Sequence, residues 1–401
     1  MNSVVRQMWE QNTDVVMVDT GNSYEGLCEY VGGKYISYTD EHPITMNPFA
    51  IKREELNIEK IGFLKNLIML IWKGTQGEVT KTEDRLIEQV ITEYFEEYFV
   101  KKQIENLSFN TFYEYSTVRI PQIIKENNLA GIDLAAYNYL LKDFYKGGSH
   151  ELTLNENLDT KLFDETFIVF EIDSIKDDPL LFPLVTLIIM DVFIQKMRIK
   201  KNRKVLVIEE AWKAIASPMM AEYIKYLYKT ARKFWASVGV VTQEIQDIVG
   251  SPIVKEAIIN NSDIVMLLDQ SKFRERFDEI KAILGLTDVD CKKIFTINRL
   301  ENKEGRSFFR EVFIRRGSVG GVFGVEEPHE CYMTYTTERA EKEALKLYKK
   351  ELQCDHQHAI EAYCRDWELS GITKSLPFAQ KVNQTGHVLN LKPKRKFDEY
   401  M

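Results

Sequence analysis

The chain has 401 residues, of which 44% are hydrophobic and 28% are charged, and its net charge at pH 7 is −8. This composition is ordinary for a globular protein of about two to three domains. The acidic balance argues against a surface that coats nucleic acid indiscriminately, although a local basic channel is compatible with it. The five cysteines form no CxxC pair, which indicates a reduced, cytoplasmic chain.

Residues 180–190 form the most apolar run of the sequence, but this run contains Pro183 and stops at Asp191. A helix that spans a bilayer needs about 20 apolar residues. Residues 1–10 carry scattered polar and charged side chains, which is unlike a signal peptide. We therefore expect a soluble chain that reaches a membrane only through a partner.

The first part of the chain changes from an α/β pattern to an all-α pattern. Residues 1–10 are typical of the end of a helix, residues 14–19 of a buried strand that ends in an acid, and residues 34–38 of a short alternating strand. Apolar residues are then spaced three to four apart, which predicts an all-α insertion packed beside the sheet. Its expected helices are residues 56–72, 82–100, 111–127 and 133–145.

Strands and helices alternate after this insertion, which predicts a parallel, doubly wound sheet with a hairpin at one edge. The expected strands are residues 166–172, 205–208, 237–242 and 263–268, and the hairpin is residues 308–315 and 319–325. The expected helices are residues 179–198, 221–234, 253–260 and 272–284. A helical pattern over residues 338–369 and a basic tail at residues 392–396 complete the chain.

The segment from Lys204 to Trp212 carries the strongest functional signal. Val205 to Ile208 are four consecutive apolar residues, which predicts a short strand buried on both faces of a parallel sheet. Glu209 and Glu210 follow at its carboxyl end, where open α/β sheets place their ligands. In P-loop motors the first acid of such a pair serves Mg²⁺, and the second orients or deprotonates the attacking water. The alternative is a strand that simply ends in two solvated glutamates.

The sequence contains no GxxxxGK[ST] motif, the loop whose backbone amides and lysine hold nucleotide phosphates. At the pair Gly33-Lys34, Cys28 stands at the position of the first glycine and Tyr35 at the position of Ser or Thr. A domain of this kind normally opens with a strand, then the phosphate loop, then a helix, whereas this chain opens inside a helix. We therefore expect the first strand and the loop to be missing from it.

Further polar residues lie at the carboxyl ends of predicted strands or just before a strand. Asp19 ends the strand 14–19, Thr242 and Gln243 end the strand 237–242, and Arg232 lies in a basic helix segment before that strand. A glutamine one strand away from a carboxylate pair can hold the attacking water, and an arginine that projects toward a neighbouring subunit can neutralise transition-state charge. Each of these residues alone is more often structural or solvated. The functional interpretation therefore depends on their order and spacing together.

A metal site is the other chemistry that the sequence suggests. Cys354, His356, His358 and Cys364 have the side chains of metal ligands. Residues two apart on a helix do not share a face, and the segment is polar and helical in pattern. An incidental polar helix is therefore favoured over a metal site.

Several motifs follow one another along the chain in a specific order. They are Val-Met-Val-Asp-Thr-Gly-Asn-Ser-Tyr (16–24), Gly-Gly-Lys-Tyr-Ile (32–36), Asn-Pro-Phe (47–49), Val-Ile-Glu-Glu-Ala-Trp (207–212), Thr-Ala-Arg-Lys-Phe (230–234) and Val-Thr-Gln-Glu-Ile (241–245). As an ordered set they resemble the TraG-family ATPases of Bacteroides-type conjugative transposons. Those ATPases belong with the type IV secretion ATPases in the FtsK–HerA lineage of P-loop motors.

The resemblance implies a RecA-like P-loop NTPase with a parallel sheet, an all-α insertion and a C-terminal helical segment. The ATPase core would comprise residues 1–52 and 160–330, the insertion residues 53–159, and the C-terminal helices and basic tail residues 331–401. It also implies hydrolysis of ATP with Mg²⁺ as cofactor. By this analogy, Glu209 serves Mg²⁺, although many relatives have Asp there, and Glu210 is the catalytic carboxylate.

The remaining site residues follow from the same analogy. Gln243 is the sensor, and Asp19 and Thr242 belong to the nucleotide site. The arginine finger is one of three residues, among which the sequence does not choose: Arg232, Arg274 and Arg276.

The resemblance further implies a hexamer or other homo-oligomer at the cytoplasmic face of the inner membrane. It would contact other secretion-channel proteins and power pilus assembly or the transfer of DNA or protein. Because the family's phosphate loop would precede Met1, we expect the chain alone to have little or no ATPase activity. Two alternatives stay open: an oligomerisation or docking module of the secretion channel, and a coupling-protein-like DNA translocase.

Overall fold

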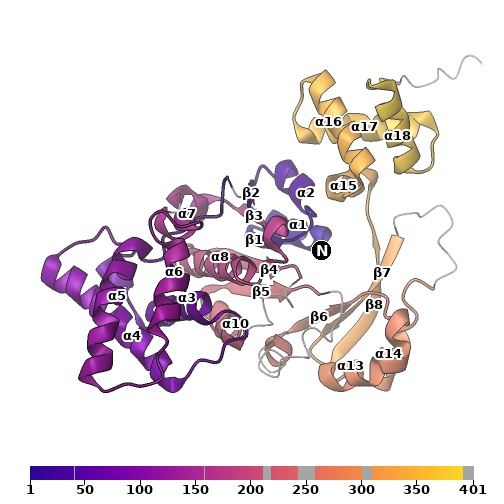
Figure 1. The fold of residues 1–401 in the computed structure, drawn as a ribbon. Coiled ribbons are helices and arrows are strands. Elements are labelled where there is room, and N and C mark those ends of the chain that lie inside the picture. Colours follow the sequence, from indigo (N-terminus) through magenta and orange to yellow (C-terminus); the bar gives the residue numbers. More distant parts are fainter. Residues whose placement is uncertain (40, 158, 211–217, 243–257, 300–308, 392–401) are drawn as a thin grey trace, which may run out of the picture. The chain divides into compact units, whose positions relative to one another are not determined.

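The computed structural model describes residues 1–39, 41–157, 159–210, 218–242, 258–299 and 309–391 (Figure 1). The chain divides into two compact units. The sheet unit comprises Gln11–Gly21 and Lys34–Asn261. The C-terminal unit comprises Met1–Glu10, Asn22–Gly33 and Ser262–Met401.

Over its described residues, the sheet unit has five strands, and every neighbouring pair is parallel. Across the sheet the strands are β2 (Lys34–Ser37), β3 (Phe167–Glu171), β1 (Thr13–Asp19), β4 (Arg203–Ile208) and β5 (Ala236–Val240). The three inner strands β3, β1 and β4 are buried along almost their whole length. Runs of β-branched and aromatic residues of this kind need cover on both faces, and the strands therefore lie where the sequence predicts them.

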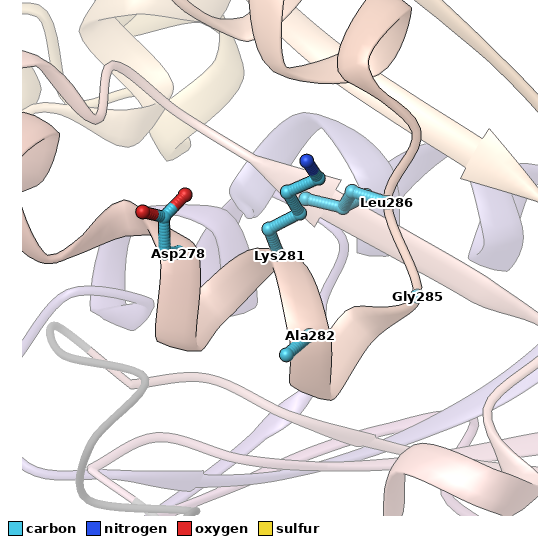
Figure 2. Close-up of a pocket in the computed structure, with 5 residues that line it drawn as sticks. All are labelled: Asp278, Lys281, Ala282, Gly285 and Leu286. Atoms are coloured by element: carbon cyan, nitrogen blue, oxygen red, sulfur yellow. The ribbon is translucent and has the colours of Figure 1, made fainter.

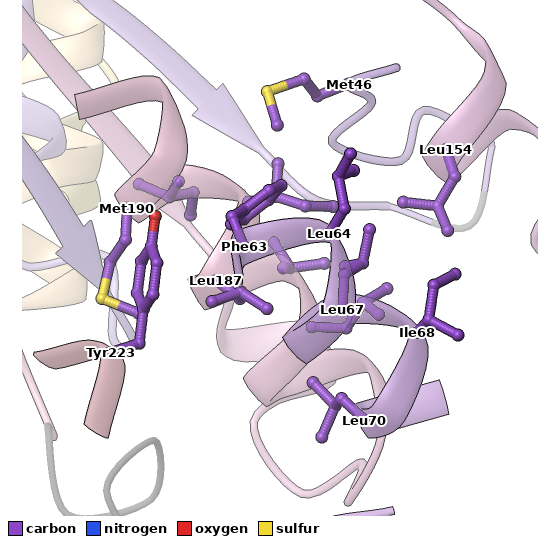
Figure 3. Close-up of a cluster of buried hydrophobic side chains, with 14 of the residues drawn as sticks. Met46, Phe63, Leu64, Leu67, Ile68, Leu70, Leu154, Leu187, Met190 and Tyr223 are labelled. Carbon is purple, nitrogen blue, oxygen red and sulfur yellow. The ribbon is translucent and has the colours of Figure 1, made fainter. Parts of the chain in front are cut away.

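The helical insertion and the sheet share one hydrophobic core. Side chains from one face of the sheet, such as Val16 and Leu206, join side chains of α3 (Ile58–Lys73), α8 (Leu181–Ile199) and α10 (Pro218–Ala231) in a single buried cluster. Figure 3 shows Phe63 and Leu67 of α3, Leu187 and Met190 of α8 and Tyr223 of α10 within this cluster. The insertion is thus part of the folding unit of the sheet.

Most of the insertion is helical, as the apolar spacing predicts. The second helix begins one residue earlier than expected because the side chain of Thr80 accepts the backbone N–H of Glu83 as its N-cap. The elements are η1 (Arg53–Glu55), α3, α4 (Lys81–Phe95), the π-helix η2 (Glu96–Lys102), α5 (Phe109–Glu126), α6 (Leu134–Leu141), η3 (Lys142–Phe144), α7 (Glu151–Asn155) and η4 (Thr160–Asp164). Further 3₁₀ turns of the sheet unit are η5 (Asp173–Ile175), η6 (Arg232–Phe234) and η7 (Ile259–Asn261).

The predicted hairpin exists, but its place at the edge of the parallel sheet was a wrong prediction. β7 (Phe309–Arg316) and β8 (Val319–Glu326) form it, and β6 (Ile264–Leu267) pairs antiparallel with β7 in a separate three-stranded sheet. A strand of four residues has the same pattern whichever partner it pairs with, so the pattern of the chain cannot choose the sheet. Phe313 of β7 is buried, and β8 packs on α14 (Asp288–Ile294). The same unit contains the helical elements η8 (Ser271–Arg276) and α13 (Phe277–Leu284).

The C-terminal unit also contains a small helical bundle. α15 (His329–Tyr335), α16 (Arg339–Leu352), α17 (His356–Ser370) and α18 (Ser375–Thr385) bury a core around Tyr348, Tyr363 and Trp367. The sequence predicts a helical pattern over residues 338–369, which the structure divides into α16 and α17, and it misses α15, α18 and α2 (Glu25–Tyr30). α2 packs on α15 and α17, and α1 (Asn2–Glu10) places Arg6 over the ring of Tyr30. No helix among the described residues is long and apolar enough to cross a membrane.

Candidate functional site

The carboxyl ends of all five parallel strands meet at one edge of the sheet unit, and acidic residues concentrate there. Asp19 ends β1 and is the Cα partner of Glu171, which ends β3. On the other side of β1, Val18 pairs with Ile208, and the backbone N–H of Glu209 donates to the carbonyl oxygen of Val18 at 3.0 Å. Acids on three adjacent strands therefore lie at the same level, about 4.8 Å apart from strand to strand.

These three acids also share one face of the sheet. Successive side chains of a strand point to opposite faces, and Val18 and Ile208 belong to the hydrophobic core on one face. Asp19 and Glu209, which follow them, therefore point to the other face, and Glu171 does so as the partner of Asp19. Asp19 and Glu171 are 1% and 3% exposed, whereas Glu209 is only partly buried. The edge thus combines two buried carboxylates with one that solvent or a ligand can reach.

Glu210, which follows Glu209 after the end of β4, has an unusual backbone conformation. Its φ is +49°, in the left-handed region that residues with a Cβ rarely adopt. Backbone strain of this kind is concentrated at functional sites. The side chain is partly buried. The carboxylate pair therefore follows β4 at the carboxyl edge of the sheet, with Glu210 in a left-handed backbone conformation.

Glu171 is a member of this row that the sequence analysis missed. Its Oε1 accepts the backbone N–H of Asp173 at 2.8 Å, and its Oε2 accepts the hydroxyl of Tyr35, from β2, at 3.2 Å. The available signal was an acid near the end of an otherwise apolar strand, residues 166–172. The link to Asp19 depends on the pairing of β3 with β1, which the chain order does not reveal.

The end of β5 lies beside the carboxylate pair. The backbone N–H of Val241 donates to the carbonyl oxygen of Ile208 at 3.0 Å, so Thr242 follows at the same edge as Glu209. Thr242 is partly buried. Gln243, the predicted sensor, lies outside the described residues.

Of the three predicted arginines, Arg232 belongs to the sheet unit, whereas Arg274 and Arg276 belong to the C-terminal unit. Arg232 belongs to η6, which precedes the amino end of β5, and this is the opposite edge of the sheet. Arg274 belongs to the C-terminal unit, where its guanidinium lies 4.8 Å from the ring centre of Phe295. Arg276 ends the same 3₁₀ helix η8, and its side chain lies outside the described residues.

Two buried lysines lie near the opposite, amino-terminal edge of the sheet and bond to partners within the sheet unit. The Nζ of Lys196, on α8, lies 2.9 Å from the carboxylate of Asp14, and both side chains are buried. The buried Lys204 donates to the carbonyl oxygens of Asn202 and Phe234, and burial lowers the pKa of its ammonium group. These contacts satisfy the two buried lysines, and we therefore assign them a role in stability.

The C-terminal unit contains a shallow hollow of about 510 Å³ on α13 and the turn after it (Figure 2). It is lined by Asp278, Lys281, Ala282, Gly285 and Leu286. The Nζ of Lys281 lies 2.5 Å from Asp288, and this hydrogen bond raises the pKa of the lysine. None of the predicted site residues whose side chains the structure describes lines this hollow, so we do not assign the function to it.

The cysteine and histidine residues of the C-terminal bundle point to separate partners. His356 Nδ1 lies 3.3 Å from Glu29 of α2, whereas the exposed His358 contacts Asp355 at 2.8 Å. Cys364 is buried in the core of the bundle, and burial raises the pKa of its thiol. Over the described part of the chain, no group of three or more His, Cys, Asp or Glu side chains could hold a metal ion.

This chain is similar in sequence and in fold to known proteins. Residues 1–367 match the family model of the TraG P-loop domain. Protein TraC of Escherichia coli (strain K12) is 21% identical over 287 residues, which are 69% of this chain and 31% of TraC. The chain thus spans about a third of the length of this curated relative.

Two solved structures share the fold. VirB4 of Thermoanaerobacter pseudethanolicus superposes with a TM-score of 0.58 at 19% identity, over 82% of this chain and 85% of that one. The plasmid coupling protein TrwB in complex with ADP and Mg²⁺ superposes with a TM-score of 0.51 at 12% identity, over 81% and 80%. The predicted RecA-like α/β fold and the resemblance to TraG-like type IV secretion ATPases are confirmed. The chain belongs to the TraG P-loop domain family.

Proposed function

We propose that this chain is the motor part of a conjugation or type IV secretion ATPase. It couples hydrolysis of ATP to pilus assembly or to transfer of DNA or protein. The observation that carries the proposal is the row of carboxylates at the carboxyl edge of the parallel sheet, with Glu209 and Glu210 at the end of β4. Membership of the TraG P-loop domain family supports it.

The residues of this edge fit a magnesium nucleotide. Mg²⁺ in nucleotide sites is bound by one or two carboxylates together with water and substrate phosphates, and the partly buried Glu209 offers such oxygens. When bound, Mg²⁺ neutralises phosphate charge. We assign Glu209 to the hydrated cation and Glu210 to the attacking water. Asp19 and Thr242 hold the two sides of the site, and Gln243 acts as sensor.

The 401 residues contain no GxxxxGK[ST] loop, so we propose that the chain alone binds ATP weakly and turns it over poorly. We also propose that it works as a homo-oligomer, with Arg232, Arg274 or Arg276 acting on a neighbouring subunit. Contact with membrane-bound channel proteins would hold it at the inner face of the membrane.

The test compares the 401-residue chain with a fusion in which the strand and GxxxxGK[ST] loop of a relative precede Met1. We expect only the fusion to bind Mg-ATP and hydrolyse it. Glu210→Gln in the fusion should lower kcat about a hundredfold or more while nucleotide binding is kept. Glu54→Gln, on the exposed turn η1, is the matched control and should leave both unchanged.

An inactive fusion would contradict the motor assignment and would favour the docking-module alternative. Robust hydrolysis by the 401-residue chain alone, lost on Glu210→Gln, would contradict the requirement for a phosphate loop and support the catalytic role of Glu210.

A further inference from the structure

We propose that Glu171 is a positioning residue of the ATPase site, and that it acts by fixing the end of β1 and the carboxylate of Asp19. This inference rests on the proposed function. It adds to that function a residue that no motif of the sequence analysis contains, and it gives a role to Tyr35 of the segment Gly-Gly-Lys-Tyr-Ile.

Glu171 connects the ends of three strands. Its backbone oxygen accepts the N–H of Tyr38, just after β2, at 2.9 Å, while the next residue, Ile172, donates its N–H to the carbonyl oxygen of Asp19 at 2.9 Å. Its side chain holds Asp173 and Tyr35 through one carboxylate oxygen each. A change of the Glu171 side chain therefore reaches β1 through Ile172, the residue that lies between Glu171 and Asp173.

The charge of Glu171 adds to this mechanical link. A buried carboxylate is stable when donors satisfy it, and the hydroxyl of Tyr35 and the N–H of Asp173 do so for Glu171. Asp19 lies one strand away on the same face and is also buried. Two like charges at this separation repel, so a Glu171 carboxylate that its donors hold in place restricts the orientations that the Asp19 carboxylate can adopt.

Tyr35 acts through Glu171 in this arrangement. Tyr35 is the register partner of Val169, so its ring lies on the same face as Glu171 two residues further along β3. Loss of its hydroxyl leaves Glu171 in place with one donor fewer. Tyr35→Phe should therefore give a weaker form of the effect of Glu171→Gln, and the double variant should resemble Glu171→Gln alone, because residues in one network are not additive.

The first measurement uses the 401-residue chain and does not depend on ATP hydrolysis. Amide hydrogen exchange of Ile172 reports its hydrogen bond to Asp19. We expect faster exchange of this amide in Glu171→Gln and in Tyr35→Phe, with Tm little changed in the latter. Tyr113→Phe is the matched control, because it removes a hydroxyl that donates to Asn138 within the helical insertion. It should leave the exchange of Ile172 unchanged.

The second measurement uses the active fusion. We expect Glu171→Gln to lower kcat about tenfold with KM within about twofold, and Tyr35→Phe to lower kcat less. A purely structural role would lower the active fraction and Tm, and Tyr35→Phe, which folds normally, would then keep the full kcat. An inactive unmutated fusion would contradict the proposed function, and the exchange of Ile172 would still decide whether Glu171 fixes β1. An active fusion in which both variants keep the original kcat would overturn this inference alone.

Discussion

Lys60 of α3 and Asp191 of α8 form a buried ion pair, with 2.8 Å between Nζ and Oδ2. Gln195 donates to the same carboxylate oxygen at 2.7 Å, and the ammonium group lies 4.6 Å from the ring centre of Phe63. The pair joins the helical insertion to the helix that leads into β4. It therefore accounts, together with the shared core, for an insertion that folds with the sheet.

Breaking this pair should be costly. Asp191→Asn leaves the ammonium of Lys60 buried without its counter-charge, and we expect the free energy of unfolding to fall by about 3–5 kcal/mol. Urea denaturation of the 401-residue chain measures it. The exposed pair Arg85–Glu88 is the control, and Glu88→Gln should cost less than about 1 kcal/mol. Equal losses in the two variants would show that Lys60 finds water or another partner.

Because the backbone of Glu210 is left-handed, we expect glycine to be more stable than alanine at this position. Glycine adopts this conformation without the steric cost of a Cβ, which is about 1 kcal/mol. Glu210→Gly should therefore be more stable than Glu210→Ala by about that amount in urea denaturation, although glycine is the less stable residue in ordinary strands. Both variants should abolish ATP hydrolysis in the fusion. A less stable glycine variant would mean that the turn relaxes once the carboxylate is removed.

Gly26 permits the close approach of α2 to α15. A Cβ built at this position would lie 2.4 Å from the backbone oxygen of Thr334. Because that oxygen belongs to the backbone and cannot swing away, Gly26→Ala should lower the free energy of unfolding by about 1–3 kcal/mol.

A matched glycine lies in α3, where a Cβ at Gly62 would meet nothing within 4 Å. Gly62→Ala should raise stability by about 0.5–1 kcal/mol through helix propensity and reduced unfolded-state entropy. Thermal melts of both variants test the pair. A Gly26→Ala protein with an unchanged Tm would contradict the close packing of α2 on α15.

Glu83 should make the start of α4 sensitive to acid. Burial alone would raise the pKa of its carboxyl group, but hydrogen bonds from Lys73 and Thr80 outweigh burial and hold the pKa below its ordinary value of 4.5. A lowered pKa stabilises the fold fully above about pH 4.5, and this contribution is lost as the pH falls through the folded-state pKa.

Glu83→Gln tests this dependence. We expect it to lower the free energy of unfolding by about 1–2 kcal/mol at pH 7 and by progressively less below pH 4.5, as measured by urea denaturation across that range. A cost that stays constant with pH would mean that the charge of Glu83 does not matter.

Much of the fold could be predicted from the sequence because its signals are local. Runs such as Val205 to Ile208 are too apolar and β-branched for any exposed element, and the apolar spacing of the insertion fits only helices. Parallel strands align their carboxyl ends, so the acids that follow them, Asp19 and Glu209, were expected at one edge. The register of β1 with β4 and the hydrogen bond from Glu209 to Val18 place these two residues at the same edge.

Only the tertiary structure decided which residues far apart in the chain lie together. β6 pairs with β7 because hydrogen-bond partners are chosen by packing, which a four-residue pattern does not encode. Glu171 joins the row of acids only because β3 pairs with β1, and Lys60 meets Asp191 only because α3 packs on α8. The sequence determined which residues form strands and helices and which acids follow the strands. The three-dimensional contacts determined which of those acids stand together, because the free energy of pairing depends on neighbours that local patterns do not specify.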